Sequence, residues 1–507
     1  MSSYMLGVDF GGGASKATLL RSDGTVICTA VLEYPTYYPN NGWAEQAPEE
    51  LLSAFVGTVR SVLKNSGVNP DEIAAMAISA ASQTGVYLDE NDKPVRNSIY
   101  WTDNRCSAYA EQLKQLDAER IYNVCKNIPS SARTVTHLRW IRENEPENHA
   151  RIARVMFVKD YIRYCLTGDF VTDYIDAMGS LLMDVDAGVW DKRLCDWAGV
   201  NENMLPKIAT PDAFVGAIKP EMLKLTGLSE NTRVIVGSTD TVMEVYANGA
   251  ICPGQMTVKL ATAGRICPIT ERNIPNPMLI NYKHVVPGLW YPGTGTKSCA
   301  ASYRWYRDVL CGAESVQAER DNVNVYKLMD EVAAKIPACS GDLYFHPYLQ
   351  GELTPYFDNS LRGSFTGVAS YHTKGHFNRA VLEGVAFSLK DCYTEIEKAD
   401  LNIREAIIIG GGAGSVIWSQ MVCDMLGIDM LKRKDADSSL GSAMLAGVAV
   451  GIFSSFADSV EKCVRTERIL HPDSEAGKIY ECGFKKYKQI HDALAGVYSS
   501  WQNQQMI

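Results

Sequence analysis

The sequence predicts an α/β protein with two domains, and three observations support this prediction. The chain has 507 residues, which is more than one hydrophobic core usually organises. Hydrophobic residues make up 46% and charged residues 21%, a globular balance. Strand-like apolar runs end in glycine-rich turns that feed helical segments, as in α/β architectures. We place the boundary near residue 250, so the expected domains are 1–250 and 251–507.

The N-terminal segment reads as a strand meander followed by a helix. Apolar residues predict strands at 4–8, 16–20 and 26–32, with a glycine turn after the first of them. Apolar positions at helical spacing predict a helix from residue 48 to about residue 64. Residues 73–80 are expected to form a buried strand, because the run is continuously small or apolar.

The second half of the chain repeats this pattern in degenerate form. Residues 234–240 read as a strand and a turn, followed by a helix over 241–250. Residues 256–260 predict a strand that runs into a turn of small residues. A later apolar strand, 405–410, enters a glycine-rich turn and then a helix over 416–426. Ligands of such folds tend to lie beyond the carboxyl ends of the strands, where these glycine turns gather.

Charge and cysteine content exclude several classes of function. The net charge of −10, with no long Lys/Arg run, disfavours nucleic acid and anionic membranes as partners. The 14 cysteines are scattered and show no zinc spacing, so reduced thiols are expected. The N-terminus has no signal-peptide pattern, and the longest mostly apolar stretch, 443–453, is short for a bilayer span. A soluble, cytoplasmic protein is the expectation.

Three glycine-rich turns follow predicted strands, at 11–13, 262–264 and 410–414. Glycine lets backbone N–H groups converge on a phosphate that a Cβ atom would keep away. None of these turns fits the Walker pattern, and the last one lacks the final glycine of the dinucleotide fingerprint. One such turn is weak support for a phosphate site, whereas three are harder to dismiss.

Two carboxylates, Asp9 and Asp240, lie at predicted strand ends. A carboxylate there can hold Mg²⁺, which prefers hard oxygen ligands, or accept a proton from a hydroxyl that attacks a phosphoryl group. Aspartate also commonly caps turns. The spacing alone leaves the chemical and the structural interpretation equally open.

Several ordered motifs resemble the FGGY carbohydrate kinase family, most closely its xylulokinase branch. The resemblance covers residues 7 to about 446. The motifs that carry it are residues 7–16 (first phosphate loop), 100–105 (Trp-x-Asp-x-Arg), 159–168 with 172–177, 347–355, and 363–368 with 376–383.

This resemblance implies an actin/hexokinase-type fold, in which two ribonuclease-H-like domains close over a central cleft that binds ATP and Mg²⁺. It implies that Asp240 is the catalytic base and that Asp9 orients Mg²⁺. The residues it implies for nucleotide binding are Gly11, Gly12, Gly13, Lys16, Thr262, Gly264, Gly411, Gly412 and Ala413. The residues it implies for substrate binding are Ser82, Gln83, Trp101, Asp103 and Asp240.

The chain departs from the family pattern at three places. Gly12 and Gly13 replace the two hydroxyl residues of the first phosphate loop. A hydrogen bond to a charged phosphate contributes about 1.5–3 kcal/mol, so losing two hydroxyl groups weakens phosphate binding unless other groups replace them. We expect backbone amides and Lys16 to compensate for this loss. The sugar-contacting pair, Met-His in xylulokinases, is Ser82-Gln83 here, and a side chain that does not titrate favours a neutral polyhydroxy substrate. His137 replaces a family lysine and is expected to be a structural surface residue.

The sequence therefore predicts a kinase that transfers the γ-phosphate of ATP to a hydroxyl of a small ketose, with a D-xylulose-like pentulose as the leading substrate. Another ketose, a sugar alcohol or an aldonate remains an alternative, as does a catalytically weak sugar-binding regulator. An aldonate would need a basic residue facing its carboxylate, and no motif supplies an obvious one. The resemblance also allows a homodimer.

Overall fold

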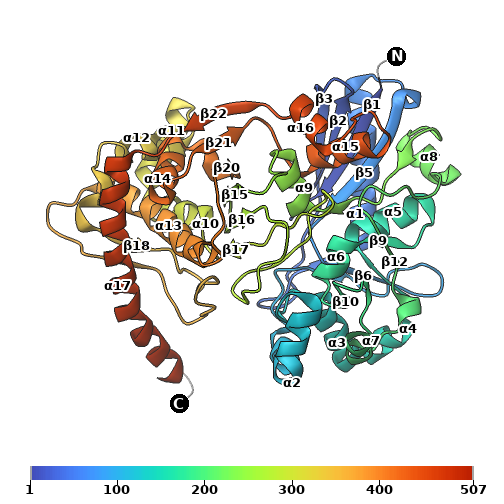
Figure 1. Ribbon diagram of the computed structural model, residues 1–507, viewed down its shortest axis with the longest axis horizontal. Coiled ribbons are helices and arrows are strands. Elements are labelled where there is room, and N and C mark those ends of the chain that lie inside the picture. Colours follow the sequence, from blue (N-terminus) through green and yellow to red (C-terminus); the bar gives the residue numbers. More distant parts are fainter. Residues whose placement is uncertain (1–2, 505–507) are drawn as a thin grey trace. The chain divides into compact units, whose positions relative to one another are not determined.

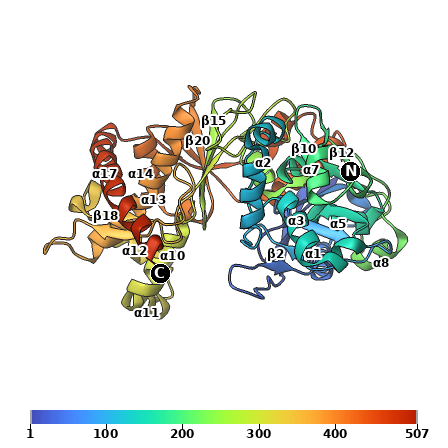
Figure 2. The same ribbon diagram turned by 90° about the horizontal axis from the view of Figure 1, so that it is seen from below.

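The computed structural model describes residues 3–504, which form two compact units (Figures 1 and 2). Unit 1 contains the chain up to Ile251 together with Glu271–Tyr291 and Asp435–Val464. Unit 2 contains Cys252–Thr270, Pro292–Lys434 and the chain from Arg465 onward. The sequence-based division placed 271–291 and 435–464 in the C-terminal domain, whereas the structure groups both segments with unit 1.

Unit 1 is built on one mixed sheet with the order β13-β5-β1-β2-β3, and β14 also pairs with β5. Strands β1, β2 and β3 form the expected antiparallel meander, whereas β5, β13 and β14 add parallel strands beyond β1. The bounds are β1 Tyr4–Phe10, β2 Ala14–Arg21, β3 Val26–Glu33, β5 Ile73–Ala80, β13 Arg233–Val234 and β14 Ser238–Thr239. Gly237 lies between β13 and β14 with φ 77°. Glycine is required there, because a Cβ atom would lie 2.0 Å from the carbonyl oxygen of Ile78.

The two faces of this sheet carry different helices. Along β1, Leu6, Val8 and Phe10 belong to a core that also includes apolar residues of α1 (Pro48–Ser66). Alternate side chains of a strand point to opposite faces, so Gly7 and Asp9 face the other side. There α15 (Ser438–Ala449) packs against β1, and a Cβ atom on Gly7 would lie 1.9 Å from the carbonyl oxygen of Ser439. This close packing explains why 435–464 belongs to unit 1.

The rest of unit 1 consists of β4, which lies between β3 and α1 in the chain, of short strands and helices inserted between β5 and β13, and of α9 and α16. The short strands are β4 Glu45–Gln46, β6 Gly85–Leu88, β7 Ser98–Ile99, β8 Arg154–Phe157, β9 Val171–Asp173, β10 Met183–Asp184, β11 Val189–Trp190 and β12 Lys207–Ala209. The helices are α2 Ser107–Cys125, α3 Thr134–Asn144, α4 Pro146–Arg151, α5 Val158–Thr167, α6 Tyr174–Gly179, α7 Lys192–Ala198, α8 Pro220–Thr226, α9 Asp240–Ala247 and α16 Phe456–Cys463.

The expected surface position of His137 is wrong. His137 lies in α3 and is fully buried, with its Nε2 atom 2.8 Å from the carbonyl oxygen of Ser131. Burial is the main cause that lowers the pKa of His137 to about 4, so the imidazole stays neutral. A lone histidine on a helix can thus be a core residue when its polar atom finds a backbone partner.

Unit 2 repeats the sheet topology of unit 1. Its order is β17-β16-β15-β20-β21-β22, in which β15 and β16 form a hairpin and β20 pairs in parallel with β15. The bounds are β15 Gln255–Leu260, β16 Gly264–Pro268, β17 Thr294–Gly295, β20 Glu405–Ile409, β21 Met430–Arg433 and β22 Thr466–Leu470. A hairpin extended by parallel strands is therefore common to both units.

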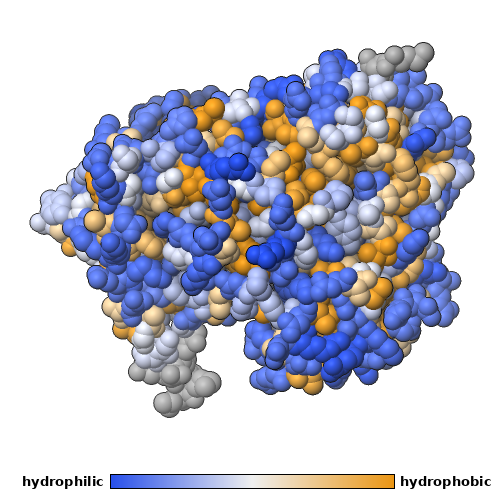
Figure 3. Space-filling model, viewed as in Figure 1, coloured by the Kyte–Doolittle hydropathy of each residue, from blue (hydrophilic) through white to orange (hydrophobic). Residues whose placement is uncertain are grey.

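Helices and one small hairpin, β18–β19, complete unit 2. Their bounds are β18 Tyr344–His346, β19 Ser364–Thr366, α10 Ala300–Leu310, α11 Gly312–Asp321, α12 Val325–Ala333, α13 Lys374–Glu397, α14 Val416–Leu426 and α17 Ser474–Gln504. None of the helices in the described part of the chain is long and apolar enough to cross a membrane. The surface over α2, α3 and α7 of unit 1 is largely hydrophilic (Figure 3).

Candidate active site

Asp9 lies near the end of β1, on the face of the sheet that α15 covers. Because β1 and β5 are parallel and in register, Asp9 is paired with Ser79 of β5. The Ser79 hydroxyl donates to Asp9 Oδ1 at 2.6 Å, and the Ser442 hydroxyl donates to Ser79 Oγ at 3.0 Å. Ser79 thus holds Asp9, and Ser442 holds Ser79, so that the fold brings together residues from three distant parts of the chain.

Asp240 begins α9 directly after β14. Its Oδ1 atom accepts a hydrogen bond from the backbone N–H of Thr241 at 2.6 Å, and its carbonyl oxygen accepts one from the Ser438 hydroxyl at 2.9 Å. Since β14 and β1 both pair in parallel with β5, Asp9 and Asp240 come from the same edge of one sheet. The structure therefore brings together the two carboxylates that the sequence placed at strand ends.

The electrostatics of Asp9 reflect this convergence. Burial of its carboxyl group and then the negative charge of Asp240 raise the pKa of Asp9 well above its ordinary value. The hydrogen bond from Ser79 acts in the opposite direction, and Asp437 and Glu244 raise the pKa further. Negative charge thus accumulates around an oxygen-only set of donors, which is the chemistry that Mg²⁺ prefers.

No three His, Cys, Asp or Glu side chains of the described residues form a group that could enclose a metal ion. Mg²⁺ does not require such a group, since it usually keeps several waters and contacts only one or two protein carboxylates. The residues present fit a hydrated Mg²⁺ beside Asp9.

The first glycine turn connects β1 to β2. The Gly11 amide donates to the carbonyl oxygen of Ala14 at 3.1 Å, and Gly11, Gly12 and Gly13 all avoid positive φ. Lys16 of β2 forms an ion pair with Asp437. Asp437 is also the N-cap of α15, where its Oδ1 atom accepts from the amides of Ser439 and Leu440 at 2.9 and 3.1 Å. Lys16 therefore lies beside the Asp9 loop with an acidic partner, and its contact with a nucleotide stays a prediction.

Gln83 follows β5 and adopts φ 56°, in the left-handed region that non-glycine residues rarely occupy. Its amide donates to Asp176 Oδ1 at 2.6 Å, and its carbonyl oxygen accepts from the Thr134 hydroxyl at 2.7 Å. Its Oε1 atom accepts from Arg133 Nη1 at 3.1 Å and from the Tyr282 hydroxyl at 2.8 Å. Such strain persists only where surrounding contacts over-determine the backbone, and it often marks a functional site.

Sequence reasoning missed Arg133 and Tyr282. Tyr282 comes from the segment 271–291, which joins unit 1 only in the folded chain. Arg133 is the N-cap residue of α3, a position where Ser, Thr, Asp or Asn is usual. An arginine at that position, just before an apolar helix, is the one signal that the sequence offers for it.

Trp101 and Asp103 differ in exposure. Trp101 is 45% exposed, whereas Asp103 is buried. Both oxygens of Asp103 accept from Arg105, and Oδ2 also accepts from the Ala44 amide at 2.6 Å. The guanidinium of Arg105 in turn lies 3.6 Å from the ring centre of Trp43. Asp103 is thus part of a buried network, and its direct contact with a sugar stays a prediction.

The remaining glycine turns lie side by side in unit 2. The turn between β15 and β16 contains Thr262, whose hydroxyl accepts from Arg304 Nη2 at 3.2 Å. The Gly264 amide donates to the Thr296 hydroxyl at 3.0 Å. Gly410 follows β20 with φ 88°, and a Cβ atom on it would lie 2.7 Å from the carbonyl oxygen of Leu260, the last residue of β15.

Gly411, Gly412 and Ala413 follow as part of a single 3₁₀ turn before α14. A Cβ atom on Gly411 would meet nothing within 4 Å, whereas one on Gly412 would lie 2.8 Å from Leu260 Cβ. The backbone at Gly411 is therefore open to approach, as a nucleotide-binding turn requires.

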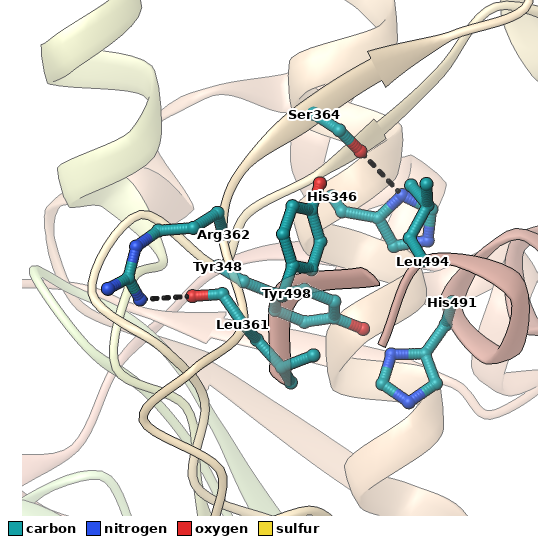
Figure 4. Close-up of a pocket in the computed structure, with 8 residues that line it drawn as sticks. All are labelled: His346, Tyr348, Leu361, Arg362, Ser364, His491, Leu494 and Tyr498. Carbon is teal, nitrogen blue, oxygen red and sulfur yellow. Dashed lines mark hydrogen bonds between the residues drawn. The ribbon is translucent and has the colours of Figure 1, made fainter. Parts of the chain in front are cut away.

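Unit 2 also has a pocket that none of the predicted site residues lines (Figure 4). It is lined by His346, Tyr348, Leu361, Arg362, Ser364, His491, Leu494 and Tyr498. His346 stacks on Tyr487 of α17 with ring centres 4.2 Å apart, and its Nε2 atom lies 3.0 Å from the Tyr487 carbonyl oxygen. These contacts pack α17 against the β18–β19 hairpin, so we assign this pocket a structural role.

Two sheets of one topology, each with a glycine turn after its first strand, define the class of the protein. They are the architecture of actin/hexokinase-type ATPases, and the predicted fold class is confirmed by solved FGGY kinase structures. The N-terminal domain model of the FGGY family of carbohydrate kinases matches residues 4–247, and the C-terminal domain model matches residues 262–450. The chain belongs to the FGGY family of carbohydrate kinases.

Similar proteins from this family act on different acceptors. The chain is 29% identical over 499 residues to the xylulose kinase of Lactococcus lactis, with 96% of each chain covered. It is 28% identical over 510 residues to the gluconokinase of Bacillus licheniformis, covering 100% of this chain and 99% of that one. The ligand-bound xylulose kinase of Lactobacillus acidophilus superposes with a TM-score of 0.91 at 25% identity, covering 98% and 100% of the two chains. The protein is thus a sugar kinase that uses ATP, and its acceptor is a small molecule.

Proposed function

We propose that this kinase transfers the γ-phosphoryl group of ATP to an acceptor hydroxyl, with Asp240 as the base. The convergence of Asp9 and Asp240 at one sheet edge carries the proposal. The negative charge of Asp240 is one cause of the raised pKa of Asp9. One carboxylate serves the metal and the other serves the hydroxyl. This division of roles explains why the fold tolerates two like charges at one place.

The chemistry follows from the character of phosphoryl transfer. The acceptor oxygen forms a bond to the γ-phosphorus as the bond between this phosphorus and the β,γ-bridging oxygen breaks, and ADP leaves. The hydroxyl proton passes to the Asp240 carboxylate. Because the transition state is loose, a positioned carboxylate suffices, and it contributes about 10²–10⁴-fold to the rate.

The residues around Asp9 would hold the phosphates and the metal. Asp9 would hold Mg²⁺, directly or through water, and this ion would neutralise charge on the phosphate oxygens. Gly11, Gly12 and Gly13 leave the backbone of the β1–β2 turn accessible to phosphate oxygens. Lys16 supplies a positive charge beside this turn.

The proposed nucleotide-binding residues of unit 2 are Thr262, Gly264, Gly411, Gly412 and Ala413. The open backbone at Gly411 supports this assignment. The adjoining turn after β15 brings Thr262 near the same edge of the unit 2 sheet, because β15 and β20 are neighbours.

The proposed acceptor-binding residues are Ser82, Gln83, Trp101 and Asp103, together with Asp240. The expected acceptor is a small polyhydroxylated molecule, with a pentulose such as D-xylulose as the first candidate from the sequence. The similar kinases named above include one for xylulose and one for gluconate, so a neutral ketose and a sugar acid are both candidates. The groups around Gln83 bear on this choice.

ADP release with Mg-ATP across ketoses, polyols and aldonates tests the proposed function. We expect acceptor-dependent turnover whose kcat falls about 10²–10⁴-fold in Asp240→Asn, with little change in KM. Asp23→Asn, in an exposed turn of unit 1, is the matched control and should leave kcat unchanged. Turnover that survives Asp240→Asn would contradict the role of Asp240. Sedimentation of the same protein would test whether it forms the homodimer that the resemblance allows.

A further inference from the structure

Arg133 is a buried cation beside the proposed acceptor residue Gln83. Only 4% of Arg133 is exposed. Its Nη1 atom donates to three neutral acceptors, namely Gln83 Oε1 at 3.1 Å, the Gly179 carbonyl oxygen at 3.1 Å and the Tyr282 hydroxyl at 2.8 Å. Burying an ion is costly unless an opposite charge accompanies it. The buried guanidinium of Arg133 is therefore expected to bind a negatively charged group.

Other buried arginines of unit 1 have such partners within the protein. Arg105 Nη2 lies 2.8 Å from Asp103, and Arg163 Nη1 lies 2.9 Å from Asp160. By contrast, the described residues place no carboxylate within 4.0 Å of the Arg133 guanidinium. The arginine beside Gln83 is the exception in an otherwise paired set.

The unused edge of this guanidinium has the geometry that recognises a carboxylate. Arg133 Nε is buried and has no hydrogen-bond partner, and no described acceptor engages Nη2 either. The Nε and Nη2 donors form one side of the planar fork, which binds the two oxygens of a carboxylate at once. The Nη1 bonds fix the orientation of this fork before any ligand arrives.

Nearby groups do not supply the missing negative charge. Asp176 accepts from the Gln83 amide and faces Lys159, with 3.4 Å between the charged atoms. Arg133 also sits at the N-terminus of α3, an eleven-residue helix whose dipole adds positive potential there. The surroundings of Gln83 thus carry a local excess of positive charge.

We propose that the acceptor of this kinase carries a carboxylate, which the Nε–Nη2 edge of Arg133 binds, so that its class is sugar acids (aldonates or keto-aldonates). The inference rests on the proposed function, since it assumes that Gln83 contacts the acceptor. It replaces the expectation of a neutral acceptor, which followed from the uncharged Gln83 side chain alone. Gln83 orients the Arg133 guanidinium through its Oε1 atom, and Arg133 determines which acceptors bind.

Acceptor pairs that differ only in charge test this proposal with the unmodified enzyme. Aldonates of four to six carbons, including D-gluconate, are compared with the alditol and the ketose of the same chain length. We expect kcat/KM for the best acid to exceed that of its neutral partners by about 100-fold or more, as the loss of a charge-assisted contact predicts. A neutral ketose as the best acceptor overturns the proposal.

Substitutions at Arg133 identify the residue responsible. Arg133→Met should lower the acid-to-neutral ratio of kcat/KM about 10- to 100-fold, through the KM of the acid. Arg133→Lys should retain part of this ratio, since it keeps the charge but loses the fork. Arg139→Met, also on α3, is the matched control and should leave the ratio unchanged. The ratio is insensitive to a fraction of misfolded enzyme. An unchanged ratio in Arg133→Met overturns the proposal.

Equilibrium binding separates this inference from the proposed catalytic role. In calorimetry, D-gluconate and the other acids should bind to Asp240→Asn and lose affinity when Arg133→Met is added. If transfer depends on Asp240 but acids bind no better than alditols, only the inference fails. If acids bind through Arg133 and transfer does not depend on Asp240, the proposed base fails and the inference stands.

Discussion

Unit 1 contains two groups of charges, one buried and one half-buried, that differ in their balance. In the first, Lys159 Nζ lies 2.6, 2.8 and 3.4 Å from carboxylate oxygens of Asp160, Asp173 and Asp176. Arg163 adds a second cation, 2.9 Å from Asp160. Burial opposes the charge on Lys159, but the three carboxylates outweigh it and raise the pKa of its ammonium. Burial raises the pKa of Asp176 to about 7. When Asp176 carries a proton, the group has two charges of each sign.

The second group, around Asp9, is acidic. Burial and the charges of Asp240, Asp437 and Glu244 all raise the pKa of Asp9. Lys16 pairs with Asp437, so the positive charge in this neighbourhood is already engaged by another carboxylate.

The difference separates a scaffold from a binding site. The Lys159 group pairs its cations with its own carboxylates. It also fixes neighbouring loops, since Asp173 accepts from the Ser238 hydroxyl at 2.9 Å and Asp176 accepts from the Gln83 amide. Ser238 lies two residues before Asp240. The Asp9 group is left with negative charge that a bound cation would offset, at a cost to the stability of the free protein.

Removing the cation of the balanced group should produce the largest change in stability. Lys159→Met leaves buried carboxylates without their counter-charge, and breaking a buried ion pair on one side costs about 3–5 kcal/mol. We expect urea unfolding to show a loss of this size in the free energy of unfolding. Lys192→Met, at an exposed helical ion pair, is the control and should change it by no more than about 0.5 kcal/mol.

A small effect of Lys159→Met would mean that the carboxylates take up protons at little cost, and the first group would no longer count as a charge-balanced scaffold. Repeating the urea unfolding of Lys159→Met at pH 5 tests this explanation, because the raised pKa of Asp176 makes protonation of its carboxyl group easier at that pH.

Removing charge from the acidic group should act in opposite directions on activity and stability. Asp9→Asn should lower kcat/KM about 10²–10³-fold, the size expected for the loss of a preorganised charge interaction. The folded-state pKa of Asp9 lies above its ordinary value of 3.8, so its contribution to stability is largest at acidic pH and is lost as pH rises through the folded-state pKa. The amide of Asp9→Asn does not titrate, so this variant does not lose stability in this way as the pH rises.

Thermal unfolding in EDTA between pH 5 and pH 8 checks the second half of this prediction. Asp9→Asn should unfold at a higher temperature than the unmodified protein at pH 8, and the difference should shrink toward pH 5. A variant that is less stable at every pH would show that Asp9 belongs with the balanced scaffold. Added Mg²⁺ should stabilise only the unmodified protein.

Several strands and helices of the two sheets could be predicted from local patterns, whereas the specific fold was expected from the family resemblance. The strands of the first hairpin, the helix that begins at Pro48 and the strand over Ile73–Ala80 follow from apolar periodicity and glycine turns, and the structure has them close to the expected bounds. The return of 435–464 to unit 1 could not be predicted from such patterns. It depends on the close approach of α15 to Gly7, a contact between residues more than 400 positions apart.

The candidate site was predictable to the extent that its residues mark turns. Asp9 and Asp240 stand at strand ends and are visible in the sequence, whereas Ser79 and Ser442 become their neighbours only through sheet pairing and helix packing. Arg133 and Tyr282 reach Gln83 from segments with no motif of their own. Charge balance in three dimensions, which singles out Arg133, has no counterpart in one-dimensional spacing.

The smallest effect concerns the glycines of the Asp9 loop, and it asks whether this loop is built for binding or for backbone strain. Gly13 avoids positive φ, and the nearest atom to an added Cβ would be 3.9 Å away, so the backbone accepts a side chain. Gly13→Thr adds a hydroxyl, which contributes about 1.5–3 kcal/mol where it reaches a phosphate. We expect a lower KM for ATP, by up to about 10-fold, and little change in stability. Gly410→Thr, at φ 88° and with 2.7 Å to Leu260, is the matched contrast and should destabilise unit 2. If Gly13→Thr instead destabilises the protein as Gly410→Thr does, the open loop beside Asp9 is a structural turn rather than a phosphate site.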